Sequence, residues 1–194
     1  MTTHGCPKLG SVSQPQVRWA NSDDAAGVAR VHVDAWRTAY RELVPASVLD
    51  ELDAERGAAR WSEWISASSE GRPTDACADI QHRLLVAEVD GRIIGWSSYG
   101  AGRDKGVSHL GEIAGLYVHP QFWSQKVGHA LITRVESELI AEGFADAYLW
   151  VLHGNSRAAN FYESHGWTAD GAEKVGVKGG VHELHELRRV RCLR

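Results

Sequence analysis

The sequence predicts an α/β fold in which helices cover both faces of one mixed sheet, and two observations predict it. Two runs typical of strands, at 82–89 and 92–100, flank the dipeptide Asp90-Gly91, which favours a tight hairpin between antiparallel strands. Beyond residue 109, segments typical of strands alternate with segments of helical periodicity. A hairpin-rich middle followed by strand–helix–strand segments favours a mixed sheet between two layers of helices.

The length and composition are those of one soluble domain. A chain of 194 residues suffices for one well-buried domain, and 43% hydrophobic with 24% charged residues is ordinary for a globular protein. Residues 1–15 are polar and rich in Gly, Pro and Ser, so we expect a flexible tail there. A single domain is then expected over residues 16–194.

The first elements of that domain follow from local signals. A short strand is expected at 17–20, followed by a helix whose N-cap is Ser22 or Asp23 and whose apolar residues recur with helical spacing. Pro45 is expected to break this helix, since proline cannot continue a helical hydrogen-bond ladder. A second helix is expected near 54–66.

The remaining elements alternate between strands and helices after the hairpin. They are a strand at 109–118, a helix at 126–141, a strand at 147–152, a helix at 156–165, a strand near 167–171 and a last strand near 181–190.

Charge and cysteine usage exclude several functional classes. A net charge of −4 and a pI near 6.2 provide no basic field for nucleic acid, so the eight tryptophans are expected in the core and in pocket walls. No apolar run approaches the roughly 18 residues of a membrane span, and no signal peptide is evident. Cys6, Cys77 and Cys192 form no CxxC pair and are interpreted as reduced thiols of a cytoplasmic protein.

The stretch HPQFWSQKVGHAL, residues 119–131, is typical of an anion-binding connection. A buried strand ends at His119-Pro120, a loop follows, and an amphipathic helix begins. This arrangement gathers free N–H groups and the positive end of the helix dipole at one point. The dinucleotide motif GxGxxG and the phosphate loop GxxxxGK[ST] are both absent. On spacing alone, an ordinary strand–helix connection is an equally good interpretation.

A second segment, NSRAANFYESHGW at 155–167, allows the segment at 119–131 to be interpreted. Together they resemble the GNAT superfamily of acyl-CoA-dependent N-acyltransferases, whose later helix commonly reads N-x-x-A-x-x-F-Y-x-x-x-G-[FW]. The matching residues are Asn155, Ala158, Phe161, Tyr162, Gly166 and Trp167. The resemblance covers roughly residues 17 to 190 and implies a GNAT-like mixed, largely antiparallel central sheet.

The cofactor loop departs from the family's fuller pattern. The segment 125–130 satisfies the pyrophosphate signature [QR]-x-x-G-x-[GA], but members usually resemble H-P-x-x-W-G-x-G-x-G-x-A-L. Ser124 and Lys126 replace two of those glycines, and only Gly128 is kept. We expect acetyl-CoA binding to survive, because the amides of 125–130 would need only helix-like or extended φ, which lysine tolerates.

The resemblance implies a set of cofactor contacts. The backbone near Leu116 to Val118 would supply an N–H donor to the developing oxyanion, and Asn155 would bond the pantetheine arm or cap its helix. The implied cofactor-binding residues are Leu116, Tyr117, Val118, Gln125, Lys126, Val127, Gly128, His129, Ala130 and Asn155.

Two catalytic residues follow from the chemistry of acyl transfer to an amine. An ammonium with a pKa near ~10.4 must lose a proton before it attacks, and Glu112, on the strand before the loop, is the candidate base. The alternative is a solvated carboxylate at a strand edge. Tyr162 matches the family's usual acid, which protonates the leaving thiolate. The resemblance places the acceptor beside Trp36 and Tyr40.

The sequence therefore predicts an N-acetyltransferase that moves an acetyl group from acetyl-CoA, its cosubstrate, to a primary amine by direct attack. The alternative is a non-catalytic acyl-CoA-binding or regulatory module that kept the fold. The acceptor is a small-molecule or peptide amine whose identity is left open, and so is the question whether the protein forms a homodimer.

His182 and His185 in VHELHELRR do not form HExxH and would point to opposite faces of a strand, so no metal is expected.

Overall fold

The structure is a computed structural model that describes residues 14–74, 79–178 and 181–194, without the side chains of residues 177, 178, 181 and 182. The expected N-terminal tail, apart from residues 14 and 15, lies outside the described residues. Cys6, Cys77 and the His182 side chain also lie outside them.

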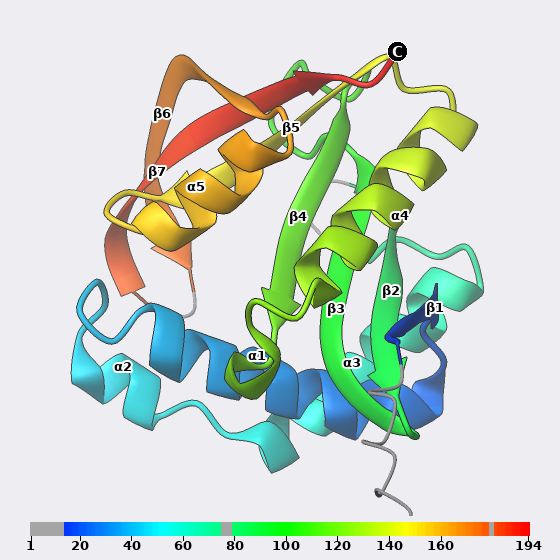
Figure 1. Cartoon of the computed structure of the whole chain (residues 1–194), viewed down its shortest axis with the longest axis vertical. Coiled ribbons are helices and arrows are strands. Elements are labelled where there is room, and N and C mark those ends of the chain that lie inside the picture. The colour runs from blue at the N-terminus through cyan, green and yellow to red at the C-terminus, as the bar shows by residue number, and fades with distance from the viewer. Residues whose placement is uncertain (1–13, 75–78, 179–180) are drawn as a thin grey trace, which may run out of the picture.

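One mixed sheet forms the centre of the described chain, with its strands in the order β1-β2-β3-β4-β5-β7-β6 (Figure 1). The strands are β1 (Gln16–Trp19), β2 (His82–Val89), β3 (Arg92–Ala101), β4 (Gly111–Val118), β5 (Asp146–Leu152), β6 (Thr168–Lys178) and β7 (Val181–Cys192). Neighbouring strands pair antiparallel except β4 and β5, which are parallel. This confirms the expected mixed, largely antiparallel sheet.

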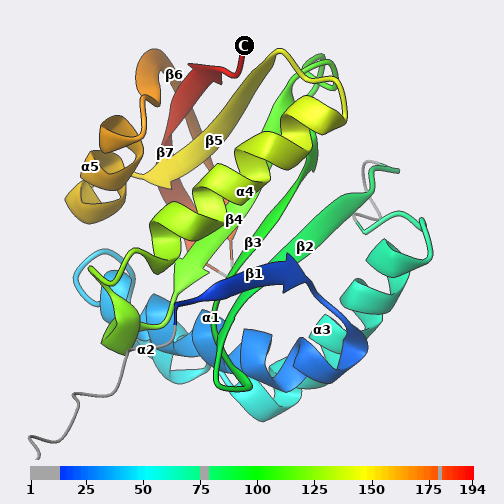
Figure 2. The same cartoon turned by 45° about the vertical axis from the view of Figure 1, so that its right-hand side comes forward.

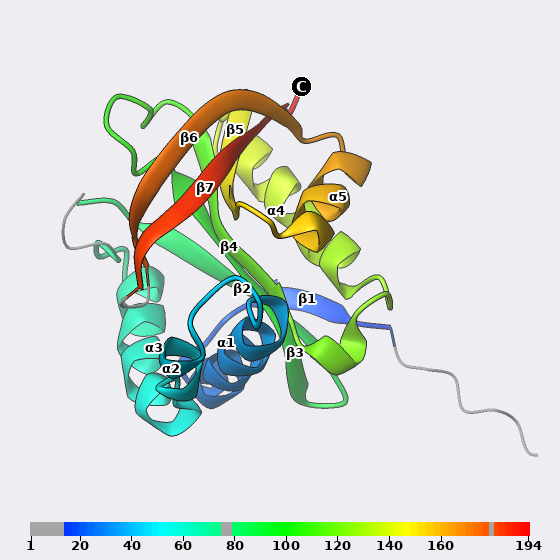
Figure 3. The same ribbon diagram turned by 90° about the vertical axis from the view of Figure 1, so that its left-hand side faces the viewer.

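Helices cover both faces of the sheet, as the sequence predicts (Figure 3). One face carries α1 (Ala25–Ala39), α2 (Ala46–Asp50) and α3 (Ala54–Ser69), and the other carries α4 (Val127–Ala141) and α5 (Ser156–Ser164). Short 3-10 turns precede α1 and α4, at η1 (Ser22–Asp24) and η2 (Pro120–Phe122). None of the described helices combines the length and the apolar character needed to cross a membrane.

Each helical layer buries its own apolar face. Leu131, Val135 and Leu139 of α4 are fully buried against the sheet, and Figure 2 shows α4 lying along β4 and β3. On the opposite face, Val28 and Val31 of α1 pack with residues of α3 and β2. These residues are three or four positions apart, so they line one side of each helix and bury a continuous stripe.

The hairpin between β2 and β3 forms at Asp90-Gly91 as expected. Both residues have positive φ, 49° and 75°, as a type I′ turn requires.

The start of α1 differs from the prediction that Ser22 or Asp23 is its N-cap. Asn21 caps the 3-10 turn that comes before the helix, since its side chain accepts a hydrogen bond from the Asp23 amide at 2.9 Å, and Asp24 takes the N-cap position of α1 itself. The Asp24 carboxylate accepts the Asn21 amide in return and is fixed by Arg18 at 2.7 Å. This reciprocal pair holds a 3-10 turn, so the α-helix itself begins only at Ala25.

The two parallel strands at the centre of the sheet separate soon after they meet. β4 and β5 pair only from Gly111 to Ile113 on the β4 side. On the other edge of β4, Gly115 pairs with Ser98 and Ile113 with Tyr99, so Ala114 is an extra residue in the ladder. A bulge of this kind increases the local twist and bends its strand. The two strands diverge beyond this point, as Figure 1 shows.

Candidate active site

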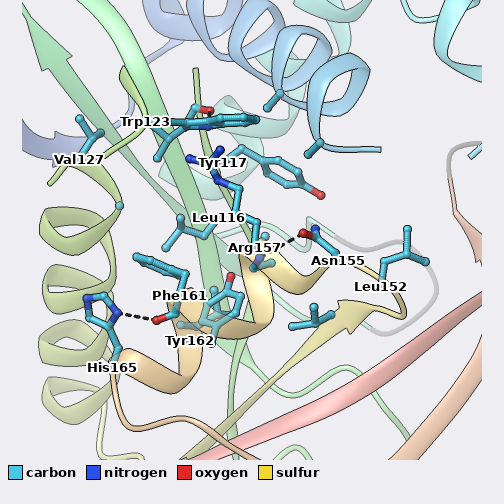
Figure 4. A pocket seen from close by; sticks show the side chains of 18 of the residues that line it. Leu116, Tyr117, Trp123, Val127, Leu152, Asn155, Arg157, Phe161, Tyr162 and His165 are labelled. Carbon is cyan, nitrogen blue, oxygen red and sulfur yellow. Dashed lines mark hydrogen bonds between the residues drawn. The ribbon is translucent and has the colours of Figure 1, made fainter. Parts of the chain in front are cut away.

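A pocket of about 380 Å³ lies where β4 and β5 diverge. Its walls come from β4 and β5, the start of α4, α5, the end of α1 and β7. Figure 4 shows Leu116 and Tyr117 entering it from β4, and Phe161 and Tyr162 from α5. A gap in a parallel pair is therefore the feature that creates the cavity.

Most of the residues predicted for the site line this pocket. They are Tyr40, Leu116, Tyr117, Val118, Lys126, Val127, Gly128, His129, Asn155 and Tyr162. Four others, Trp36, Glu112, Gln125 and Ala130, are not among its lining residues. The side-chain amide of Gln125 instead donates a hydrogen bond to the Gln121 carbonyl at 2.8 Å.

The loop before α4 adopts a backbone that the sequence analysis did not expect. Ser124 has φ 61° and Lys126 has φ 64°, both in the left-handed region. The expectation that helix-like or extended φ suffices here is therefore wrong. A non-glycine residue in this region costs about 1–2 kcal/mol because its Cβ crowds the following carbonyl oxygen. The family's glycines at these two positions thus have a conformational reason.

Gly128 serves the site in a different way, by leaving room for α5. Its φ is not positive, but a Cβ placed on it would lie 3.1 Å from the Phe161 ring. The missing side chain lets the first turn of α4 approach Phe161 closely, and both residues line the pocket.

The first turn of α4 offers backbone N–H donors to the pocket. The earliest backbone bond of the helix runs from the Ala130 amide to the Lys126 carbonyl at 2.9 Å. The N–H groups of Val127, Gly128 and His129 precede it and have no acceptor within the helix. With the helix dipole, they favour an anion at this point.

The free edge of β4 supplies a second set of donors. The His119 amide donates to the Ile94 carbonyl of β3 at 2.8 Å. Along a strand successive N–H groups point to opposite sides, so those of Leu116 and Val118 face away from β3, toward the gap. The Val118 carbonyl on that side accepts a hydrogen bond from the Trp123 indole at 2.8 Å.

Tyr162 is buried, with only 7% of its surface exposed, and it lines the pocket. Burial and the neighbouring Tyr117 raise the pKa of its hydroxyl well above the ordinary value of 10.0. Among the described residues, none is found to hydrogen-bond this hydroxyl. The phenol therefore keeps its proton at neutral pH and can donate it into the pocket.

Asn155 caps its helix, which is one of the two roles expected for it, whereas its hydrogen bond to the pantetheine arm stays a prediction. Its side chain accepts a hydrogen bond from the Ala158 amide at 3.1 Å, which caps α5, and the residue also lines the pocket (Figure 4).

Glu112 lies in a buried polar network rather than in the pocket wall. Its carboxylate accepts two side-chain hydrogen bonds from Arg103, at 2.7 and 3.0 Å, and one from the Arg103 amide at 2.9 Å. The Tyr148 hydroxyl donates to it at 3.2 Å, and the His82 ring lies 3.9 Å away. Burial alone would raise the pKa of Glu112, but the hydrogen bonds and charge of Arg103 hold it below its ordinary value. Its role as a base stays a prediction.

Trp123, Arg157 and Glu186 are among the lining residues that the sequence analysis did not assign to the site. The Arg157 guanidinium stacks 3.3 Å from the centre of the Trp123 ring and so joins α5 to the loop before α4. Glu186 lies in VHELHELRR, where strand alternation places it on the same face as the buried Leu184. This alternation along the strand is the sequence signal that could have identified Glu186 as an inward-facing residue.

The other sequence features gave no site within the described residues. No group of three or more His, Cys, Asp or Glu side chains in residues 14–74, 79–178 and 181–194 could hold a metal ion. Trp61 and Trp96 lie with their ring centres 4.8 Å apart in the core between α3 and the sheet.

Comparison with known proteins agrees with this geometry. Residues 36–167 match the family described as the acetyltransferase (GNAT) family. YuaI of Bacillus subtilis (strain 168), an uncharacterised N-acetyltransferase, is 29% identical over 150 residues, which is 77% of this chain and 78% of YuaI.

Solved structures share the fold. The PaiA N-acetyltransferase from Thermoplasma acidophilum, in complex with coenzyme A, superposes with a TM-score of 0.70 at 16% identity, covering 93% of this chain and 99% of that one. YncA from Salmonella typhimurium, a putative acetyltransferase with its cofactor acetyl-CoA, superposes with a TM-score of 0.65 at 21% identity, covering 94% and 95%. With a family match over most of its length and this shared fold, the chain belongs to the GNAT acetyltransferase family.

Proposed function

We propose that the protein transfers an acetyl group from acetyl-CoA to a primary amine by direct attack. The observation that carries this proposal is the gap between β4 and β5. It brings the free edge of β4, the first turn of α4 and the Tyr162 hydroxyl to one pocket. These are the groups that binding a phosphorylated thioester and protonating its leaving sulfur require.

The residues present fit acetyl-CoA. The amides of Val127, Gly128 and His129 would hold the pyrophosphate, and the exposed Lys126 adds a cation beside them. The edge of β4 at Leu116 and Val118 would hold the pantetheine arm, together with Asn155. Two structural neighbours that share this fold are described with coenzyme A or acetyl-CoA.

Bound acetyl-CoA supplies a thioester carbonyl for the amine to attack. One N–H group of this β4 edge, at Leu116 or Val118, stabilises the negative charge that develops on the carbonyl oxygen, and the other is left to the pantetheine arm. The Tyr162 hydroxyl donates its proton to the sulfur as the C–S bond breaks, and it regains a proton from the nitrogen that has bonded to carbon. Before attack, the ammonium gives up one further proton to a base. Glu112, predicted for that step, does not line the pocket.

A non-catalytic acyl-CoA-binding module is the second candidate function. The loss of two glycines favours it, since Ser124 and Lys126 hold a left-handed backbone at a cost of about 1–2 kcal/mol each and add side chains beside the proposed phosphate position. The two candidates differ in whether bound acetyl-CoA is consumed.

The experiment follows release of free thiol from acetyl-CoA with a panel of primary amines, beside calorimetric titration of acetyl-CoA. We expect binding and amine-dependent thiol release together. Binding without release in the presence of any amine would support the non-catalytic module instead.

We expect Lys126→Glu to weaken acetyl-CoA binding by at least about tenfold, which corresponds to 1.4 kcal/mol. The change replaces a cation beside the proposed phosphate position by an anion. Lys126→Gly removes the cation and the left-handed strain together, so it should bind less tightly at low salt, and this loss should shrink at high salt. Calorimetry at two salt concentrations checks both variants.

Ser124→Gly is the matched control, because it relieves the same kind of strain at φ 61° without removing a charge. It should bind acetyl-CoA at least as tightly as the wild type. Tighter binding by Lys126→Gly than by the wild type at low salt would show that the lysine obstructs the loop.

A further inference from the structure

The pocket passes through the sheet from one helical layer to the other. Leu116 of β4 and Val151 of β5 line it and belong to the core on the α4 side. Their neighbours Tyr117 and Leu152 line it as well, but they pack with Trp36 of α1 on the opposite face. The gap between β4 and β5 therefore opens the cavity toward both layers.

The two ends of the cavity differ in charge. The end toward α4 is lined by basic and imidazole side chains of α4, α5 and their caps, which are Lys126, His129, Arg157 and His165. We call the end toward α1 the acceptor end, and among its lining residues are Ala35, Ala39, Tyr40, Tyr117, Leu152 and Glu186. Figure 4 shows Leu152 and the Tyr117 ring on the opposite side of the pocket from Val127. Because the proposed phosphate position lies at α4, the amine meets the thioester from the acceptor end.

Glu186 is the charged residue of this group, and its carboxylate already has a cationic partner. It lies on the same face of β7 as Leu184, which packs on the α1 side. Its carboxylate lies 3.8 Å from the Lys174 ammonium of β6, which lies 3.8 Å from Asp104 as well. The Trp150 ring, which lines the pocket, lies 4.3 Å from the same ammonium. An acceptor cation would therefore have to compete with Lys174 for this carboxylate.

The other residues of the acceptor end are uncharged and leave space beside α1. The Tyr40 and Tyr117 hydroxyls lie 3.4 Å apart, and burial together with Tyr117 raises the pKa of Tyr40, so its phenol stays neutral. Leu152 adds aliphatic carbon from β5. Ala35 and Ala39 are four positions apart on α1 and so share one side of the helix. Their single methyl groups leave volume that larger side chains would fill.

We infer that the acceptor is a primary amine whose remaining body is uncharged and apolar, an alkyl or arylalkyl group that lies between Ala39 of α1 and Leu152 of β5. This inference rests on the proposed acetyl transfer and names its substrate class. The reacting nitrogen is uncharged when it attacks, whereas a second ammonium or a carboxylate on the acceptor would stay charged inside the cavity. Such a charge is costly to remove from water without a partner of its own. An apolar body instead gains free energy as it leaves water.

Two pairs of probes test the charge rule. Pentylamine and the diamine putrescine have equally long chains and differ in whether the far end is a methyl group or an ammonium. 2-Phenylethylamine and phenylalanine differ in a carboxylate beside the amine. We expect the uncharged member of each pair to be acetylated with kcat/KM at least about 10²-fold above its charged partner, because the extra charge has no counter-ion. Thiol release from acetyl-CoA measures each rate.

Ala39→Leu tests where the apolar body lies. The larger side chain fills the space beside α1, so the ratio of kcat/KM for 2-phenylethylamine to that for the shorter propylamine should fall by at least about tenfold. A general loss of folded protein would lower both rates and leave this ratio unchanged. Ala26→Leu, at an exposed position of the same helix that does not line the pocket, is the matched control and should keep the wild-type ratio.

The outcomes separate the inference from the proposed function. Putrescine or phenylalanine reacting as fast as its uncharged partner would overturn the acceptor class while leaving acetyl transfer intact. A wild-type ratio in Ala39→Leu would overturn the position of the apolar body beside α1. Acetyl-CoA binding without thiol release for any of these amines would contradict the proposed function, and the inference with it.

Discussion

We expect Tyr162→Phe to lower kcat for an amine acceptor by about 10²-fold, the usual scale of lost acid catalysis. The variant keeps the ring that packs in the core and removes only the hydroxyl that faces the pocket. Because the raised pKa of this phenol keeps it protonated at neutral pH, the wild type has a proton to deliver to the leaving sulfur. Steady-state kinetics with the wild type and the variant measure the effect.

Acetyl-CoA affinity should be nearly unchanged in that variant, since the proposed phosphate and pantetheine contacts lie on α4 and β4. Tyr99→Phe serves as the control, because it removes another buried hydroxyl from a residue that does not line the pocket, and it should leave kcat unchanged. Should Tyr162→Phe turn over as fast as the wild type at neutral and at mildly alkaline pH, Tyr162 is not the acid.

The second large effect is expected on stability, from Glu112→Ala. The change leaves Arg103 and the Tyr148 hydroxyl without the carboxylate that they contact at 2.7 and 3.2 Å. Removing one partner of a buried ion pair costs about 3–5 kcal/mol, and we expect the lower value because the Arg103 side chain is 36% exposed and can turn to water. Denaturant unfolding measures the loss in free energy of unfolding.

The stability effect should depend on pH in a defined direction. Since the pKa of Glu112 is held below its ordinary value of 4.5 in the folded chain, its ionised form stabilises the fold above that pH. The contribution is lost as the pH falls through the folded-state pKa. The difference in free energy of unfolding between the wild type and Glu112→Ala should therefore be largest at neutral pH and should decrease in acid.

Glu70→Ala is the control for this experiment. Glu70 pairs with Arg72 at 2.7 Å, but both side chains are more than half exposed, so its loss should change stability by less than about 1 kcal/mol. If Glu112 were instead the catalytic base, Glu112→Gln would keep the wild-type melting temperature and regain activity as the pH rises.

The sequence predicts the architecture well because its signals are local. The hairpin at Asp90-Gly91 and the periodicities of α4 and α5 depend on neighbouring residues alone, and the structure confirms them. The prediction of Ser22 or Asp23 as the N-cap of the first helix was wrong. The capping pair of Asn21 and Asp24 depends on Arg18, which holds Asp24 from a strand outside the helix. A longer-range contact decided that boundary.

The site was only partly predictable for the same reason. The bulge at Ala114 opens the pocket, yet it shows only in the register of β3 against β4 and leaves no mark in GEIAGLYV. The left-handed backbone at Lys126 was also missed, because lysine is a residue that seldom adopts it. Glu186 reaches the pocket through the pairing of β5 with β7, two strands whose partners a single sequence does not reveal.

The most direct test of the central claim is mass spectrometry of a mixture of protein, acetyl-CoA and 2-phenylethylamine. Direct transfer predicts an amine one acetyl group heavier, an equal amount of free CoA, and a protein whose intact mass is unchanged, both with the amine and before it is added. Intact acetyl-CoA beside unmodified amine would contradict acetyl transfer, and an acetylated protein that forms before the amine is added and then passes its acetyl group to the amine would contradict direct attack.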